Sequence, residues 1–388
     1  MTETQQSSTP PLLPPTTEDD RFAWLRLLRS YRVGTSTFYR LMAEHGSAQR
    51  ALAALPAVAR SAGLDQYAPC PEARIEAELT AARAARATLI CIGAPGYPAE
   101  LARITDAPPM LWAVGDATLL DRPTVALVGA RNASSLGTRM ARALAKELGE
   151  AGFVVASGLA RGVDAAAHLA ALETGTVAVL AGGVDVIYPP ENAGLAADIA
   201  ERGLLLSEQP MGMAPQARHF PCRNRIISGL AQAVVVVEAA ARSGSLITAR
   251  DALDQGREVL AVPGHPFDAR AAGCNTLIRD GATLVRGGRD VIAALPPEQE
   301  DAIEEVKRAQ REVPQSPPPA PPPDRRSLRE TAQLHQQILS RLGPSPLGED
   351  QLIRDLSVPP GRVGPALVDL ELEGKITRQA GGLLSLRQ

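Results

Sequence analysis

The chain has 388 residues, of which 45% are hydrophobic and 21% are charged, so it is too long for one compact core and we expect two or three soluble domains. The formal net charge at pH 7 is only −3, which excludes a global basic field, so a polyanion would have to meet a local basic patch. Just three of the 40 basic residues are lysines (Lys146, Lys307 and Lys375), so such a patch would be built from arginine, which donates two parallel hydrogen bonds.

Residues 1–20 are polar and rich in proline, and we expect them to be disordered. They contain no basic stretch followed by an apolar one, and the chain nowhere has 18 uninterrupted apolar residues, so we expect a cytoplasmic protein with no membrane association. The four cysteines are far apart, without the Cys-x-x-Cys spacing of a metal site, and we expect no metal, no cofactor and no disulfide framework. These cysteines are Cys70, Cys91, Cys222 and Cys274.

Residues 21–87 have apolar residues at helical spacing, with Gly34 and Gly46 between the runs. The pattern predicts an N-terminal domain of short helices, similar to a SAM or helix–hairpin–helix module. The Val33-Gly34 turn is typical of helix–hairpin–helix modules that bind the DNA backbone, but the pattern favours a plain packing domain.

Residues 88–296 form the largest predicted domain. Residues 88–92 predict an edge strand, and residues 97–112 predict a connecting arm packed on the next part of the chain. From Thr124 onward, runs rich in Val and Leu alternate with helical segments, which predicts an α/β fold: an extended Rossmann-like, doubly wound parallel sheet buried on both faces. The predicted strands are 125–128, 153–156, 177–180, 204–206, 234–237, 259–262 and 283–285.

Ligands of such sheets bind beyond the carboxyl ends of the strands, so the loops at that edge are the candidate site. The segment Ser157–Asp164 follows a strand and opens a helix, which leaves N–H groups unpaired beside Arg161 and predicts a cradle for phosphate. A tight turn shaped only by its glycines is the alternative. The residues predicted to bind at this edge are Gly129, Arg131, Ser134, Ser157, Gly158, Arg161, Gly162, Arg218, His219, Phe220, Arg223, Asn224, Arg225, Ser243, Gly244, Ser245 and Thr248.

A nucleic-acid backbone fits these residues better than a cofactor does. The loop after the first parallel strand lacks G-x-G-x-x-G, and no lysine completes a P-loop. A row of arginines and N–H donors can follow successive phosphates of a single strand, and Phe220 offers a face on which a base can stack. Core packing is the alternative for Phe220.

Asp164 and His168 are four residues apart on one predicted helix, as in an acid–base pair. No activated nucleophile or metal ligand accompanies them, so no catalytic residue is assigned. We favour the alternative, in which Asp164 caps the helix and His168 packs beneath the loop.

Eight motifs occur in order between about residues 97 and 282. They are Val128-Gly129-Ala130-Arg131, Ser157–Asp164 with His168, Tyr188-Pro189, Leu206-Ser207-Glu208, Phe220–Leu230, Val237-Glu238-Ala239, Ser243–Ala249 and Val262-Pro263-Gly264. Together they resemble the motifs of the bacterial DNA-processing protein A family (DprA, also called Smf).

The resemblance implies a single-stranded-DNA-binding recombination mediator, not an enzyme, that acts in natural transformation (competence). Such a protein protects incoming single-stranded DNA and helps to load RecA recombinase onto strands covered by single-stranded-DNA-binding protein. Where a basic residue is expected shortly before Phe220, this chain offers Arg218 or His219. The resemblance also implies a homodimer through the end of the Rossmann-like domain, for which the apolar candidates are Leu284, Val285, Val291, Ile292 and Leu295.

Residues 297–326 are acidic and then Pro-rich, which predicts an extended linker. Residues 327–388 predict a winged-helix domain, with helices at 334–342, 349–356 and 361–373 and a hairpin over 375–386. The third of these helices carries Asp369, Glu371 and Glu373, which would repel phosphate, so protein docking is at least as well supported as DNA binding.

A nucleotide-binding or nucleoside-monophosphate-cleaving Rossmann enzyme of the lysine-decarboxylase-like type is the alternative function. Those enzymes use a Gly-Thr loop followed by a catalytic Glu, whereas here Thr248 is followed by Ala249 and Arg250. Release of free base from nucleoside monophosphates would favour this alternative.

Overall fold

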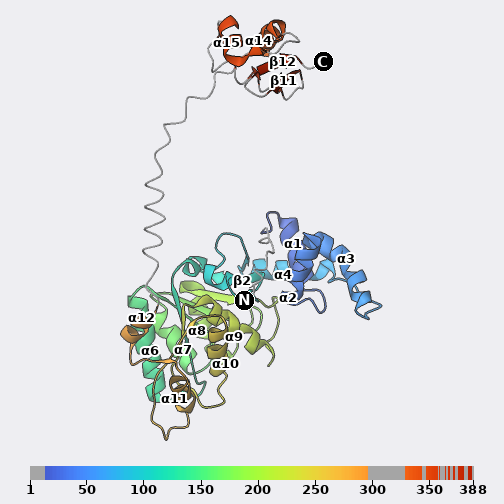
Figure 1. The fold of residues 1–388 in the computed structure, drawn as a ribbon. Helices are drawn as coiled ribbons and strands as arrows, with labels where there is room; N and C mark the ends of the chain where they lie inside the picture. Colours follow the sequence, from blue (N-terminus) through green and yellow to red (C-terminus); the bar gives the residue numbers. More distant parts are fainter. Residues whose placement is uncertain are drawn as a thin grey trace, which may run out of the picture. The chain divides into compact units, whose positions relative to one another are not determined.

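The computed structural model describes residues 14–295, 328–342, 347–356, 358, 363, 366–367, 370–371, 375–379 and 383–386. The chain divides into two units, Met1–Glu298 and Gln299–Gln388, both drawn in Figure 1. The predicted linker, 297–326, lies outside the described residues. Within the described segments, no helix is both long enough and apolar enough to cross a membrane.

Four helices open the first unit: α1 (Glu18–Leu28), α2 (Thr35–His45), α3 (Ala48–Ser61) and α4 (Glu72–Ala84). A capping box begins α1, because the Thr17 hydroxyl accepts from the Asp20 amide while the Asp20 carboxylate accepts from the Thr17 amide. The expected disorder of residues 1–20 is therefore wrong for its last three residues. Gly46 follows the last residue of α2 and adopts φ 75°, a left-handed conformation that glycine allows at low cost.

The N-terminal helices share one hydrophobic core with the sheet. Trp24, Phe38 and Leu41 belong to the same buried cluster as Leu180 and Leu205 of the sheet domain. A hydrogen bond crosses this boundary as well: the buried Glu78 of α4, which is paired with Arg29 at 2.9 Å, accepts from the indole N–H of Trp112 in the sheet at 2.9 Å. Apolar packing and this buried hydrogen bond thus attach the helical bundle to the sheet.

The remainder of the first unit is built around one nine-stranded sheet of order β1-β2-β6-β5-β4-β3-β7-β8-β9. Its elements are β1 (Thr88–Cys91), α5 (Ala99–Ala102), β2 (Met110–Gly115), η1 (Ala117–Asp121), β3 (Thr124–Val128), α6 (Ser135–Glu150), β4 (Val154–Ser157), α7 (Val163–Ala171), β5 (Thr176–Val179), η2 (Pro190–Asn192), α8 (Ala193–Arg202), β6 (Leu204–Ser207), α9 (His219–Leu230), β7 (Ala233–Val236), α10 (Ser245–Asp254), β8 (Glu258–Ala261), α11 (Ala272–Arg279), β9 (Thr283–Leu284) and α12 (Gly288–Ala294).

The seven strands from β6 to β9 in this order are mutually parallel, which confirms the predicted Rossmann-like fold. One prediction is wrong: residues 110–112, the end of the predicted connecting arm, belong to strand β2, which pairs antiparallel with both β6 and β1. Strand β2 therefore extends the parallel sheet, and β1, the predicted edge strand, is its outermost member.

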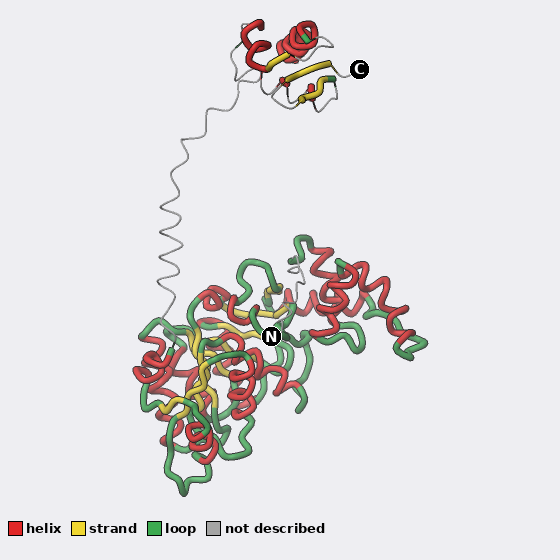
Figure 2. The backbone as a smooth tube through the Cα atoms, in the orientation of Figure 1, coloured by secondary structure: helices red, strands yellow, loops and turns green. Residues whose placement is uncertain are grey.

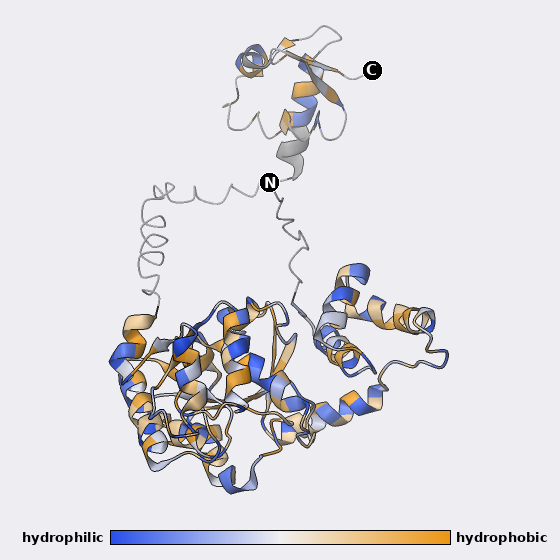
Figure 3. Ribbon diagram, turned by 60° about the horizontal axis from the view of Figure 1, so that its bottom comes forward, coloured by the Kyte–Doolittle hydropathy of each residue, from blue (hydrophilic) through white to orange (hydrophobic). Residues whose placement is uncertain are grey.

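Helices cover both faces of the sheet, and Figure 2 shows the strands as a band with helices around it. Alternate residues of β3 point to opposite faces. Val125 and Leu127 belong to the same buried cluster as residues of α6, α7 and α12, whereas Ala126 and Val128 belong to a cluster with residues of α9, α10 and α11. The helices carry hydrophilic and hydrophobic residues in alternation (Figure 3), as expected for elements with one face on the core. All strand residues of β3 and β7 are buried.

The predicted dimer residues divide into two groups. Val285 and Val291 are fully buried and Leu295 is nearly so, all in the core beneath α6, so the prediction that they face a partner is wrong. Leu284 of β9 is 43% exposed and Ile292 of α12 is 38% exposed.

The second unit contains α14 (Leu328–Arg341), β10 (Leu347–Gly348), α15 (Glu349–Leu356), β11 (Ile376–Gln379) and β12 (Leu383–Leu386). Its strands form an antiparallel sheet of order β10-β12-β11, which contains the predicted hairpin and one strand, β10, that was not predicted. The predicted third helix lies mostly outside the described residues, including Asp369 and Glu373.

Candidate nucleic-acid interface

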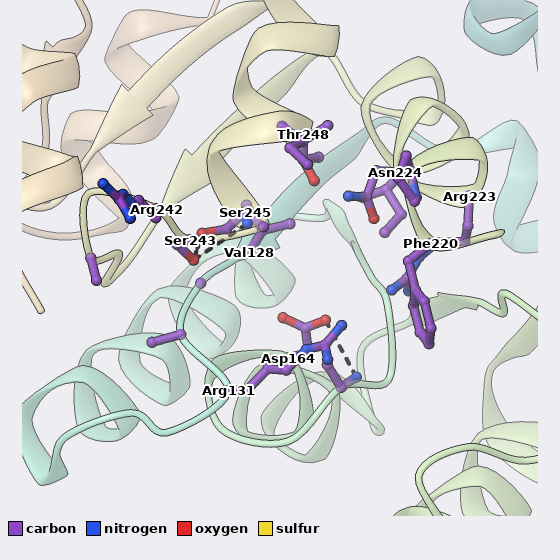
Figure 4. Close-up of a pocket in the computed structure, with 18 of the residues that line it drawn as sticks. Val128, Arg131, Asp164, Phe220, Arg223, Asn224, Arg242, Ser243, Ser245 and Thr248 are labelled. Carbon is purple, nitrogen blue, oxygen red and sulfur yellow. Dashed lines mark hydrogen bonds between the residues drawn. The ribbon is translucent and has the colours of Figure 1, made fainter. Parts of the chain in front are cut away.

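A cavity of about 690 Å³, which we call the main cavity, lies at the carboxyl edge of the sheet. It is lined by the loops after β3, β4 and β7 and by the first turns of α9 and α10. In Figure 4, Asn224 and Thr248 face Arg131 and Asp164 across this main cavity. Predicted site residues that line it are Gly129, Arg131, Phe220, Arg223, Asn224, Ser243, Gly244, Ser245 and Thr248. A smaller side hollow adjoins it and is lined by Gly158, Arg161 and Tyr188, sharing Arg131, Phe220 and Arg223 with the cavity. We call the two together the groove.

Phe220 lies where the main cavity and the side hollow meet. Its ring is half-buried and lines both, so Phe220 is not a core residue. The guanidinium carbon of Arg131 stands 5.2 Å from the ring centre, a cation–π contact, and the Tyr188 ring lies 5.9 Å away at 59°. Tyr188 was not among the predicted site residues, although the Tyr-Pro pair lies in the segment that follows β5 at the same edge of the sheet.

A buried arginine forms the floor beneath Phe220. Arg223 is 6% exposed and donates from Nη1 to the carbonyl oxygen of Val179 at 2.8 Å. The guanidinium lies against Gly158, where a Cβ atom would come within 1.7 Å of Nη1, so only glycine fits there. Burial lowers the pKa of Arg223 to about 10, opposed by the charge of Asp164, so Arg223 remains charged at neutral pH.

The loop between β4 and α7 satisfies most of its own amides. Asp164 Oδ2 accepts from the amides of Gly158 at 3.2 Å and Ala160 at 3.4 Å, and His168 Nε2 accepts from the Leu159 amide at 3.3 Å. The predicted phosphate cradle is therefore wrong for these three donors. Among the described residues, the amides of Arg161 and Gly162 have no acceptor.

Asp164 and His168 are structural residues. The prediction that His168 packs beneath the loop is confirmed: the ring is fully buried and its Nδ1 lies 2.7 Å from the Thr176 hydroxyl. Burial lowers the pKa of His168 to about 3, so the ring is neutral at pH 7. The capping prediction for Asp164 needs correction, because its carboxylate caps the loop amides and not the first turn of its own helix. Burial raises the pKa of Asp164, and the charge of Arg223 opposes the shift.

Arg225 does not reach the groove. Its side chain is 13% exposed and binds Glu208 Oε2 at 2.5 Å and Asp106 Oδ2 at 3.3 Å. Both of its carboxylate partners come from the far side of α9, so we correct its assignment from a phosphate contact to a structural ion pair.

Four further predicted residues are engaged elsewhere. Ser134 caps α6, since its hydroxyl accepts from the Gly137 amide at 2.9 Å and donates to Glu238. His219 is buried, and its Nδ1 accepts from the Gln216 amide at 3.2 Å. Ser157 is buried and donates to the Leu127 carbonyl oxygen, while Gly162 packs against the carbonyl oxygen of Ala130.

Exposed arginines surround the groove. Arg131, Arg161 and Arg242 line it, and Arg218 is exposed at the start of α9, next to Ala217 in the cavity wall. Arg161 lies 3.5 Å from Glu191, a pair in which both side chains are open to solvent. Of the two candidates before Phe220, Arg218 is the one that solvent, and hence a phosphate, can reach.

A parallel sheet whose carboxyl edge holds exposed arginines around a half-buried phenylalanine defines a Rossmann-type protein with a candidate site for a phosphate-bearing ligand. Comparison with known proteins makes this more specific. A family model for DNA recombination-mediator protein A matches residues 88–296, one for a DprA-like N-terminal HHH domain matches 18–81, and one for the DprA winged helix domain matches 315–382. This chain belongs to the DNA-processing protein A family, and its N-terminal helices are of the helix–hairpin–helix type that the sequence pattern favoured less than plain packing.

Two relatives and one solved structure give the degree of similarity. DNA processing protein DprA of Bacillus subtilis is 43% identical over 236 residues, which cover 60% of this chain and 78% of the relative. DNA processing protein DprA of Streptococcus pneumoniae is 47% identical over 199 residues, 51% of this chain and 70% of the relative. An X-ray structure of the Streptococcus pneumoniae protein has a TM-score of 0.55 and 41% identity, and the match covers 59% of this chain and 79% of that one.

Proposed function

We propose that this protein binds single-stranded DNA in the groove without cleaving it. The observation that carries the proposal is the ring of exposed arginines, Arg131, Arg161, Arg218 and Arg242, around an aromatic side chain at the edge of a cavity. Arginines can hold successive phosphates, and a base can stack on the exposed part of the Phe220 ring or on the guanidinium plane of Arg131.

The carboxylate chemistry of the cavity supports binding over catalysis. Among the described residues, Asp164 is the one carboxylate that lines the main cavity, and it already accepts from two loop amides. Thr248 is followed by Ala249 and not by a glutamate. A nucleoside-monophosphate-cleaving enzyme would need an acid or base free to reach its substrate, whereas the carboxylate that the described part of the cavity offers is already held by loop amides.

Family membership supports a proposal for the biological role. We propose that the protein is a recombination mediator of natural transformation, which protects incoming single-stranded DNA and passes it from single-stranded-DNA-binding protein to RecA recombinase. This work would take place in the cytoplasm, whose reducing conditions suit four unpaired cysteines.

Removing a charge and removing a stacking ring should have different effects on DNA binding. Arg131→Ala should weaken binding to mixed-sequence strands uniformly and lower the slope of log affinity against log salt by roughly 0.7, the share of one phosphate. Phe220→Ala should cost roughly 1–3 kcal/mol, about 5- to 150-fold in affinity, and leave that slope unchanged. Salt titrations with labelled oligo-dT, followed by fluorescence anisotropy, measure both quantities.

Arg142→Ala is the matched control for this experiment, because Arg142 is an exposed arginine of α6 that does not line the groove. It should retain wild-type affinity and slope. Duplex DNA should bind more weakly than single strands, since a paired base cannot turn its face to Phe220. Equal affinity for duplex, or wild-type binding by both groove variants, would place the DNA elsewhere.

We also propose a homodimer that forms through β9 and α12. Strand β9 is at the end of the sheet, and Leu284 and Ile292 are large exposed apolar residues there. The double variant Leu284→Glu, Ile292→Glu should be a folded monomer by light scattering, whereas Leu169→Glu, at a similarly exposed leucine of α7, should remain a dimer. A double variant that stays dimeric would move the interface to another surface.

A further inference from the structure

An aromatic pair stands in the loop between β8 and α11, outside the groove. The Phe267 side chain is 94% exposed, and its ring centre lies 5.5 Å from that of His265, with 40° between the planes. The Phe267 amide donates to His265 Nδ1 at 3.3 Å, which joins the two residues. A phenylalanine this exposed gains almost nothing from folding, so its place is not explained by packing.

The loop is attached to the wall of the groove. Strand β8 is the parallel neighbour of β7, with Ala261 opposite Val236, so the loops after the two strands leave the same edge side by side. The amide of Gly273 donates to the Ala239 carbonyl oxygen at 2.7 Å, in the segment that leads from β7 to Arg242. Gly273 allows this contact, because a Cβ atom there would lie 2.8 Å from the carbonyl oxygens of Ala239 and Ala240.

The charges between Phe220 and Phe267 favour a polyanion. Arg242 lies on the intervening loop, is exposed, and forms no ion pair with any residue that the structure describes. The carboxylate next to Phe267, Asp268, accepts from the Arg270 amide at 3.0 Å and from its guanidinium at 3.1 and 3.2 Å. These bonds lower the pKa of Asp268 and match its negative charge with a positive one, so the tip of the loop does not repel phosphate.

We propose that Phe267, with His265, is a second base-stacking site for the single strand that occupies the groove. The strand would leave the main cavity past Arg242 and place a later base on the Phe267 ring. This inference rests on the proposed function and adds to it the path of the DNA along the edge of the sheet, from β3 over β7 to β8. An aromatic face that every base can stack on, next to a cationic path, is the usual composition of a sequence-tolerant single-strand site.

The surroundings of Phe267 favour a base over a protein partner. The exposed residues next to Phe267 include Pro266 and Ala269, which are small, and Arg270, which is charged. A protein anchor is normally surrounded by packed contacts that exclude water, whereas a stacked base needs only one face of the ring.

Strands of different length can distinguish the effects of the two stacking sites, because only a long strand can reach both. Phe267→Ala should bind the shortest oligo-dT, of about four nucleotides, as wild type does, and should lose about tenfold in affinity for strands of about sixteen nucleotides, the upper end of common single-strand sites. Phe267→Trp should keep wild-type affinity at every length because it keeps the aromatic face. Neither variant should change the salt slope, since no phosphate contact is removed.

Phe267→Trp also reports contact directly. The native tryptophans, Trp24 and Trp112, are buried, so a tryptophan at position 267 would be the solvent-exposed emitter in the described part of the chain. Its fluorescence should be quenched by long oligo-dT and not by the shortest strands. Leu169→Trp, on the outer face of α7, is the control and should show no quenching.

The outcomes distinguish this inference from the function on which it rests. Wild-type protein that binds no oligo-dT at all would refute the proposed function. Wild-type protein that binds, with Phe267→Ala equal to it at every length and no quenching of the tryptophan emission in Phe267→Trp, would refute the stacking site alone. Loss of self-association in Phe267→Ala, with unchanged DNA affinity, would show that the loop contacts a second copy of the chain and would likewise overturn the inference.

Discussion

Replacing Arg225 by alanine should lower the free energy of unfolding by about 3–5 kcal/mol, the typical cost of leaving one member of a buried ion pair alone. Glu208 is the member left behind. Burial raises the pKa of its carboxyl, and Arg225 is the largest influence that opposes this shift. Without Arg225, the Glu208 carboxylate must either stay charged in a buried place or take up a proton on folding. Urea denaturation followed by circular dichroism measures the loss.

The pH dependence of this loss identifies its cause. A carboxyl whose folded pKa lies above its ordinary value of 4.5 binds a proton on folding, and its stabilising effect is lost as the pH rises. The deficit of Arg225→Ala relative to wild type should therefore be smaller at about pH 5 than at about pH 8. The double variant Arg225→Met, Glu208→Gln removes both charges and should recover most of the stability. Unchanged stability together with a reduced salt slope of DNA binding would return Arg225 to the phosphate contacts.

Acidification should destabilise the protein through His168. In the folded state the pKa of this buried ring is about 3, against 6.5 for an ordinary histidine. Between these values the unfolded state binds more protons than the folded state, so stability is present above pH 6.5 and is lost as the pH falls. The full loss over this range is of the order of 5 kcal/mol, because each unit of pKa shift corresponds to about 1.4 kcal/mol.

A comparison of variants isolates this contribution. Asp164 and Glu208 have raised pKa values, so acidification acts on them in the opposite direction, and the wild-type curve alone mixes these effects. His168→Asn should be less stable than wild type at pH 7, since it loses buried packing, but the difference should shrink as the pH falls below 6.5. His265→Asn, at an exposed histidine, should follow the wild-type curve. Parallel curves for wild type and His168→Asn would contradict the buried neutral ring.

Sequence patterns predicted the parallel strands of the sheet but missed the antiparallel strand β2. Apolar runs such as Val125–Val128 and Val234–Val237 are buried on both faces of a parallel sheet and need no tertiary information to be recognised. Strand β2 was missed because it follows two prolines and joins the sheet at its antiparallel end, where the pairing partner, β6, lies about ninety residues further along the chain.

The arginines of α9 show most clearly what a sequence motif cannot predict, namely which side chains reach the groove. Arg223 and Arg225 belong to one motif and are indistinguishable by type, but residues two apart on a helix point about 200° away from each other. Arg223 therefore lies beneath the groove, while Arg225 meets Asp106 and Glu208 on the other side. Helix geometry also explains why Ile292 of α12 is exposed while its neighbour Val291 is buried, because successive residues of a helix point about 100° apart.

By itself, the sequence determined the fold class, the family and the edge of the sheet at which the site lies, because continuous apolar runs, ordered motifs and the loops after parallel strands are all properties of neighbouring residues. Only the tertiary structure decided which donors at that edge are available to a ligand. The amides of Gly158 and Ala160 look unpaired in the sequence, yet Asp164 accepts from both, and the Arg131 side chain is open while Arg225 is bound. A donor is free only when no acceptor lies within hydrogen-bonding distance in space, and the distances across the fold that decide this are not contained in the spacing along the chain.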